Sequence, residues 1–188
     1  MNCINYSIIA EAVKAYTALG YQQIEVPWWA TGNVINITKP TVANSREDYQ
    51  ISANGKYLLA SGEQGFLYLA NKGQLPPGKY QTVTPCFRNE PYDETHSKQF
   101  MKLELIDLQA ESFTSIAQAN ALVYSMADDA IKTMAVLSRL GSRPLHSTAR
   151  FNRRSLFVSD PVAYRINDEV SNQVDIELGC LVPVRLSS

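Results

Sequence analysis

The sequence has 188 residues, of which 45% are hydrophobic and 19% charged, and its formal net charge is −1. These values are typical of a single globular domain with a substantial core, and they exclude a strongly basic molecule built for nucleic-acid binding. Three well-separated cysteines, Cys3, Cys86 and Cys180, indicate neither a disulfide framework nor a cysteine zinc site. The sequence shows no secretion leader and no 18-residue apolar segment, so we expect a cytoplasmic protein without a membrane partner.

The first part of the chain predicts a helix followed by a strand. Apolar residues recur at helical spacing over residues 4–19, and Gly20 is a natural helix end. Residues 21–29 then predict a strand, in which Pro27 favours an edge or interface position. The adjacent Trp28–Trp29 pair fits an interface and core packing equally well.

The next segment predicts a loop, a hairpin and a short helix. Residues 31–48 are polar and unpatterned, which is typical of a loop. Asn54-Gly55 lies between two strand-like runs and predicts a hairpin, because both residues tolerate positive φ. Ser61-Gly62-Glu63 then precedes a helix predicted over residues 64–71. These three residues fit a helix start capped by Ser61, and they fit a ligand contact by Glu63 equally well.

Residues 84–104 predict two strands joined by a polar loop. Side chains alternate across a strand, so each strand has one polar and one apolar face. The apolar face carries Met101, Leu103 and Leu105. The polar face is expected to carry Thr84, Cys86, Arg88, Glu90, Phe100, Lys102 and Glu104, with His96 near the end of the loop. Such a face suits an anionic, planar ligand, because guanidinium binds phosphate and a phenyl ring supports stacking. An ordinary amphipathic hairpin with solvated charges is the alternative.

The remainder predicts a long helix and further strands. Residues 112–140 show a continuous apolar stripe at helical spacing, and this helix is expected to cover the back of the sheet. His146 is expected in a loop without a catalytic role. Strands are predicted over residues 155–165 and 173–180. In the second of these, Asp175 and Glu177 share a polar face that could hold Mg²⁺, although a half-exposed strand shows the same alternation.

The order Phe-Arg-x-Glu, short loop, His-x-x-x-Phe and acidic strand resembles motif 2 of class II aminoacyl-tRNA synthetases, especially the phenylalanyl, pyrrolysyl and seryl types. The resemblance implies that Arg88 binds the α-phosphate of ATP and that Phe100 stacks on adenine. It also places Glu90 in the nucleotide site and assigns the outer phosphates to His96.

Other segments extend this resemblance. Gly20-Tyr21-x-x-Ile24-x-x-Pro27 is similar to motif 1, which implies a homodimer formed through residues 4–29. Ser61-Gly62-Glu63 resembles a Thr-x-Glu that recognises the α-amino group of an amino acid substrate, a role that falls to Glu63. The strand containing Glu177 resembles the strand before motif 3, which implies that Glu177 assists catalysis. It also implies that Glu177 and Glu104 bind Mg²⁺ together. Glu104 is in addition a candidate contact to the substrate.

The resemblance implies an α+β domain over residues 1–188, an antiparallel sheet flanked by helices. Motif 3 and an anticodon-binding domain are not found in the sequence, and a truncated form of a longer protein would account for this. Two functions follow. The protein binds ATP with Mg²⁺ and activates a small amino acid-like substrate as its adenylate, or it is a catalytically inactive paralogue that serves as a ligand-binding, regulatory or accessory subunit. A tRNA partner is compatible with the family but receives no support from the net charge.

Overall fold

The computed structural model describes residues 4, 6–38, 48–52, 54–89, 98–109, 116–138, 143–149, 158–159, 162–167 and 173–181. The helices in these ranges are α1 (Tyr6–Ala18), α2 (Gly32–Thr38), α3 (Gly62–Asn71) and α4 (Ile116–Ser138). The strands are β1 (Gln22–Gln23), β2 (Trp29–Thr31), β3 (Gln50–Ser52), β4 (Lys56–Leu58), β5 (Gly78–Phe87), β6 (Gln99–Leu108), β7 (Arg143–Ala149), β8 (Val158–Ser159), β9 (Val162–Asn167) and β10 (Gln173–Leu181).

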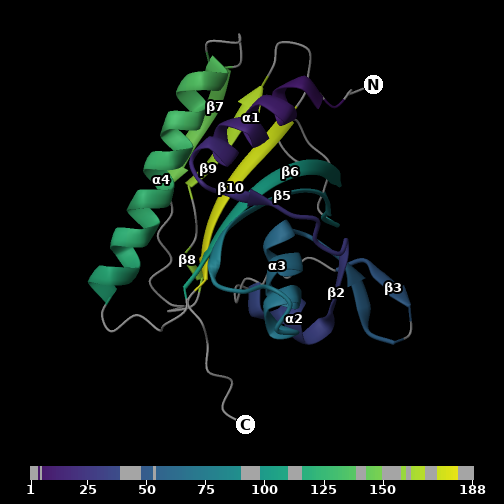
Figure 1. The fold of residues 1–188 in the computed structure, drawn as a ribbon. Helices are drawn as coiled ribbons and strands as arrows, with labels where there is room; N and C mark the ends of the chain where they lie inside the picture. Colours follow the sequence, from purple (N-terminus) through teal and green to yellow (C-terminus); the bar gives the residue numbers. More distant parts are fainter. Residues whose placement is uncertain are drawn as a thin grey trace.

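The strands form one large and one small sheet (Figure 1). The large sheet has the order β1-β5-β6-β10-β9-β7, with β8 also paired to β10, and the small sheet has the order β2-β4-β3. Helices α1 and α4 lie together on one side of the large sheet, whereas α2 and α3 lie beside the small sheet (Figure 1). The described part of the chain is therefore a sheet with helices on both faces, as expected for an α+β fold.

The large sheet is not antiparallel throughout. Strands β5 and β6 pair antiparallel, but β10 pairs parallel with β6, and β1 pairs parallel with β5. Helix α4 carries the chain back along the sheet after β6, so that β7 runs in the direction of β6. Two antiparallel steps, from β7 to β9 and from β9 to β10, then bring β10 beside β6 in the same direction.

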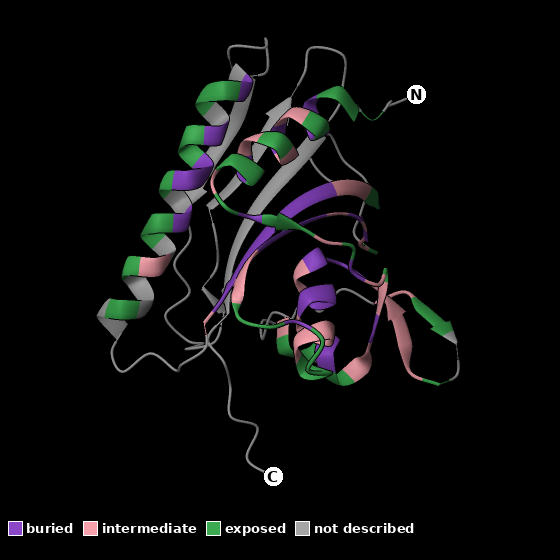
Figure 2. Ribbon diagram, in the orientation of Figure 1, coloured by how far each residue is buried: buried purple, intermediate pink, exposed green. Residues whose placement is uncertain are grey.

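Two hydrophobic cores lie on opposite faces of the β5–β6 pair. On one face, Leu103 and Leu105 pack with α1 and α4, including Ala12, Met126 and Ala130. On the other face, Tyr80, Ile106 and Leu108 pack with α2, α3 and the small sheet. Figure 2 shows buried positions on the sides of α1 and α4 that face the sheet, and exposed positions on their outer sides. The long helix was thus correctly expected on the back of the sheet.

Several local predictions differ from the structure. The strand expected over residues 21–29 is divided, because β1 pairs with β5 in the large sheet whereas β2 pairs with β4 in the small one. The loop expected over residues 31–48 contains α2, which is stabilised by burial of Val34 and Ile35. His146 lies in β7 and not in a loop. The Asn54-Gly55 hairpin is confirmed, and Gly55 adopts a φ of 70° in its turn.

No helix within the ranges that the structure describes is both long enough and apolar enough to cross a membrane.

Candidate functional site

The polar face of the β5–β6 hairpin is assembled by the strand register. Thr82 lies opposite Glu104, Thr84 opposite Lys102, and Cys86 opposite Phe100. Directly opposed residues in an antiparallel pair share a face. The register therefore places these six residues on one surface, and it confirms the face predicted for Thr84, Cys86, Phe100, Lys102 and Glu104.

The start of α3 lies directly on this surface. A Cβ atom on Gly62 would stand 2.7 Å from Thr84 Cγ2 and 3.1 Å from Thr82 Cγ2, and it would collide with the Glu104 carboxylate. Only glycine permits so close an approach of the backbone. Residues 60–63, which we call the 60–63 segment, are thus pressed onto the strands that carry the polar face.

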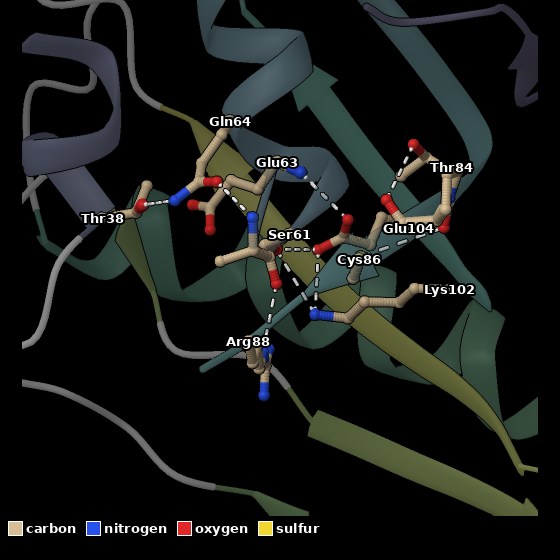
Figure 3. A network of polar contacts seen from close by, with 11 residues as sticks. Thr38, Ser61, Glu63, Gln64, Thr84, Cys86, Arg88, Lys102 and Glu104 are labelled. Carbon is tan, nitrogen blue, oxygen red and sulfur yellow. Dashed lines mark hydrogen bonds and ion pairs between the residues drawn. The ribbon is translucent and has the colours of Figure 1, made fainter. Parts of the chain in front are cut away.

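A buried polar cluster joins the 60–63 segment to β6 (Figure 3). Lys102 is 0% and Glu104 2% exposed, and Lys102 Nζ lies 3.1 Å from Glu104 Oε1. The Ser61 hydroxyl donates a hydrogen bond to Glu104 Oε1 and lies 3.3 Å from Lys102 Nζ. The backbone N–H of Glu63 donates to Glu104 Oε2 at 3.0 Å. Both oxygens of Glu104 are therefore engaged by protein donors.

Ser61 occupies the N-cap position of α3 but does not act as a side-chain cap. Its backbone is extended, with φ −160° and ψ 141°, and its side chain makes no capping hydrogen bond. The hydroxyl turns instead toward the sheet and binds Glu104. The alternative in which Ser61 caps the helix through its side chain is therefore wrong, because the Glu104 carboxylate accepts the Glu63 N–H in the first turn of α3 and the Ser61 hydroxyl does not.

Arg88 lies immediately after β5 and contacts both the 60–63 segment and the opposite strand. Its Nε donates to the Ala60 carbonyl oxygen at 3.1 Å, and its Cζ lies 5.1 Å from the centroid of the Phe100 ring. Both side chains are half-buried. The structure thus brings together Arg88 and Phe100, two of the four residues expected to contact the nucleotide, and the Ala60 carbonyl and the Phe100 ring hold the guanidinium between them.

Of the other predicted site residues, the structure gives positions for Glu63 and Glu177. Glu63 lies in the first turn of α3, at the end of the 60–63 segment, and is half-buried. Glu177 is the Cα partner of Glu104 in the parallel β6–β10 pair, so the backbone sets these two positions on neighbouring strands. Glu90 and His96 lie outside the described residues, and the structure leaves their assignments as predictions.

The contacts of Glu104 do not favour the expected Mg²⁺ site. A magnesium ligand must offer carboxylate oxygen to the ion, whereas the oxygens of Glu104 bind Lys102, Ser61 and the Glu63 N–H. Within the part of the chain that the structure describes, no group of three or more His, Cys, Asp or Glu side chains could hold a metal ion. Mg²⁺ binding by Glu104 and Glu177 stays a prediction, and we derive no chemical step from it.

Cys86 shares this face but is unsuited to nucleophilic chemistry. Burial, with a smaller contribution from the Glu104 carboxylate, raises the pKa of its thiol to about 12. Because the thiolate is the reactive form, a thiol with this pKa is inert near neutral pH. Cys86 is therefore not a candidate nucleophile.

Sequence reasoning missed the role of Ser61 and Lys102. Alternation correctly placed Lys102 beside Glu104 on the face of β6, but it gives no information about what covers that face. One signal was available in the sequence, because Gly62 at a helix start permits a close backbone approach.

No family model and no curated protein matches this chain. Solved structures do resemble it. The cytoplasmic serine-tRNA ligase of Naegleria fowleri, solved in complex with AMP, matches over 90% of this chain and 42% of its own, with a TM-score of 0.56 and 18% identity. The pyrrolysyl-tRNA synthetase PylSc of Desulfitobacterium hafniense matches over 86% of this chain and 54% of its own, with a TM-score of 0.56 and 14% identity. A second pyrrolysyl-tRNA synthetase structure from the same organism covers 87% and 55%, with a TM-score of 0.52 and 15% identity.

These similarities define the class of fold. The chain has a class II synthetase-like fold, as its sequence predicted, and it spans about half the length of the synthetases that it resembles. At 14–18% identity the similarity concerns the fold alone, and function is argued from the site.

Proposed function

We propose that this protein binds ATP on the polar face of β5 and β6 and activates an amino acid-like substrate as its adenylate. The observation that carries the proposal is the placement of Arg88. Arg88 lies at the end of β5, and its guanidinium is held by the Ala60 carbonyl and the Phe100 ring. The fold around it is similar to that of a synthetase that was solved with AMP. A guanidinium held in this way is suited to a phosphate group.

The proposed ligand contacts follow from this placement. Arg88 binds the α-phosphate, and Phe100 provides an apolar ring on which adenine stacks. Glu90 and His96 complete the nucleotide site from the β5–β6 connection, with His96 near the outer phosphates. Glu63 binds the α-amino group of the substrate, since a carboxylate pairs with an ammonium group. Glu104 contributes by holding the 60–63 segment.

The proposed reaction is a displacement at phosphorus. A carboxylate oxygen of the amino acid attacks the α-phosphorus of ATP and forms a new O–P bond to it. The bond between the α-phosphorus and the oxygen that bridges the α- and β-phosphates breaks, and pyrophosphate leaves. Negative charge grows on the α-phosphate oxygens in the transition state, and Arg88 offsets it. The protein contributes mainly positioning and electrostatic stabilisation.

Two variants and two ligands test the nucleotide site. Arg88→Ala removes a charge-assisted contact of roughly 1.5–3 kcal/mol, so ATP affinity measured by calorimetry should fall about ten- to hundredfold while adenosine affinity stays nearly unchanged. Phe100→Ala should weaken adenosine because it removes the stacking surface, and it should weaken ATP at least as much because the ring also contacts Arg88. Thr133→Val, a change in a buried residue of α4, is the matched control and should alter neither affinity.

The reaction is tested by pyrophosphate exchange with each amino acid in turn. Exchange with one amino acid, abolished or strongly reduced in Arg88→Ala, is the expected result. ATP binding with no exchange for any amino acid would contradict the enzyme and leave the inactive paralogue. Absence of ATP binding by the unaltered protein at millimolar nucleotide with Mg²⁺ would overturn the nucleotide site itself.

We further propose a homodimer formed through residues 4–29. Large hydrophobic side chains are exposed in this part of the chain, at Ile4, Tyr6 and Trp28. Apolar and aromatic groups of this kind are enriched at interfaces between subunits. Sedimentation should show a dimer at micromolar concentration, and a monomer would count against the proposal.

A further inference from the structure

The cluster formed by Ser61, Lys102 and Glu104 is not used by the proposed chemistry, yet it touches the segment that holds Arg88. We propose that this cluster is a positioning device, which fixes the 60–63 segment and, through it, both the Arg88 guanidinium and the Glu63 residue. The inference rests on the proposed nucleotide site, and it adds that ATP binding there requires a fixed 60–63 segment.

The hydrogen bonds of the 60–63 segment support this role. At one end, the Ala60 carbonyl accepts a hydrogen bond from Arg88 Nε. In the middle, the Ser61 hydroxyl binds Glu104 and lies within hydrogen-bond distance of Lys102. At the other end, the Glu63 N–H binds Glu104. The segment that β6 holds in place therefore contacts Arg88 at one end and contains Glu63 at the other.

The energetics of the cluster also favour a positioning role over a purely stabilising one. Burying an ammonium and a carboxylate together costs desolvation energy, and an apolar pair of similar volume is often at least as stable. Farther along the same face, β6 uses Ile106 and Leu108, which pack in an apolar core with Phe66. On this face of β6, the buried charges thus lie only in the part that faces the 60–63 segment.

The arrangement also sets the geometry of Arg88. Its Nε is directed at a carbonyl whose neighbouring residue is bound to β6, and its Cζ lies over the ring of Phe100, which is also on β6. One strand therefore fixes the guanidinium from two sides. Loosening the 60–63 segment should free the Nε contact and leave the contact with Phe100.

Ser61→Ala tests the device without altering any charge. It removes the hydroxyl that links the segment to both Lys102 and Glu104. We expect ATP affinity to fall about three- to tenfold, which is the scale of one hydrogen bond, and adenosine affinity to stay within about twofold, because Phe100 is untouched. Ser61→Thr retains a hydroxyl and should restore the affinity for ATP. Thr133→Val again serves as the control that deletes a buried hydroxyl away from the site.

A purely structural role predicts a different outcome. In that case Ser61→Ala lowers the melting temperature but leaves the ratio of ATP to adenosine affinity unchanged, and this result would overturn the inference. Should Ser61→Ala fail to fold, the double variant Lys102→Met/Glu104→Gln removes both charges while nearly preserving volume. It should show the same selective loss of ATP affinity, and an unchanged ratio would again overturn the inference.

The two proposals fail in distinguishable ways. If Arg88→Ala weakens ATP selectively and Ser61→Ala does not, only the positioning device is wrong. If the unaltered protein does not bind ATP, or Arg88→Ala binds it equally well, the nucleotide site is wrong and the positioning device falls with it.

Discussion

The side-chain amide of Gln81 donates a hydrogen bond to the carbonyl oxygen of Val13, 3.0 Å away, across the contact between β5 and α1. The same nitrogen lies 2.9 Å from Thr17 Oγ1 and 3.1 Å from the Tyr21 carbonyl. Gln81 is fully buried, and its one amide nitrogen lies within hydrogen-bond distance of all three acceptors. A donor at this position thus ties α1 and the turn after it to the large sheet.

Gln81→Glu should destabilise the protein strongly. The variant replaces the amide donor with a carboxylate beside two carbonyl oxygens, and placing a buried charge against acceptors is costly. We expect the free energy of unfolding at pH 7 to fall by about 2–3 kcal/mol more than in Gln81→Met, which keeps the shape but has no charge. Urea unfolding of both variants measures the difference. Equal losses would show that the donor contributes nothing beyond side-chain volume.

Gly62→Ala should destabilise the protein through a steric clash. The added methyl group would meet Thr84 Cγ2 and the Glu104 carboxylate, both in the close-packed contact between the 60–63 segment and the sheet. Overpacking of this kind costs about 1–3 kcal/mol. Thr84→Ser removes the opposing methyl group and should recover part of the loss in the double variant. Thermal melts of the single and double variants test this, and a fully stable Gly62→Ala would contradict the close packing.

Asp107→Asn should stabilise the protein at neutral pH. Asp107 is buried opposite Lys79 in the β5–β6 pair. Burial raises the pKa of its carboxyl, although Lys79 and the Gln109 amide act in the opposite direction. An acid with a raised pKa in the folded state contributes most to stability below its ordinary pKa, and the contribution is lost as pH rises through the folded value.

The amide side chain that this change introduces would carry no charge, and its oxygen could still accept the hydrogen bond from Gln109. We therefore expect the Tm of Asp107→Asn to exceed that of the unaltered protein by up to a few degrees at pH 7.5, with a smaller difference at pH 4. A lower Tm at pH 7.5 would show that the attraction between Asp107 and Lys79 outweighs the cost of burial.

Cys86 should resist alkylation in the folded protein. Its thiol is fully buried, and its pKa of about 12 leaves only about one ten-thousandth of it as thiolate at pH 8. Iodoacetamide labelling at pH 8, followed by mass analysis of the peptide that contains Cys86, should be slow in buffer and fast in urea. Equal rates in the two conditions would indicate that the 60–63 segment opens readily above it.

The sequence pattern predicted those features of the site that depend on a single hairpin. Alternation assigned Arg88, Phe100 and Lys102 to one face, and the register of β5 and β6 confirms this for the two residues on β6. The apolar face with Leu103 and Leu105 was likewise expected to pack on a long helix, and it packs on α4. Both results follow from local periodicity, which the backbone geometry of a strand or helix imposes directly.

Features that depend on distant segments were not predicted. Lys102 and Glu104 were expected on a ligand-facing surface, but the 60–63 segment buries them. Helix α2 has β-branched residues with weak helix propensity and forms because Val34 and Ile35 are buried in the core beneath it. Periodicity identifies the residues that share a face, whereas the covering of that face is decided by tertiary packing.

The position of β6 between β5 and β10 has a consequence for synthesis on the ribosome. Its first neighbour, β5, is already complete when β6 emerges, but its second neighbour, β10, follows only after α4, β7 and β9. Until then the edge of β6 from Lys102 to Leu108 presents unpaired backbone N–H and C=O groups beside an apolar sequence. An open edge of this kind is prone to pair with other chains. The β6 edge of the nascent protein is therefore open to pairing with other chains until β10 has been made.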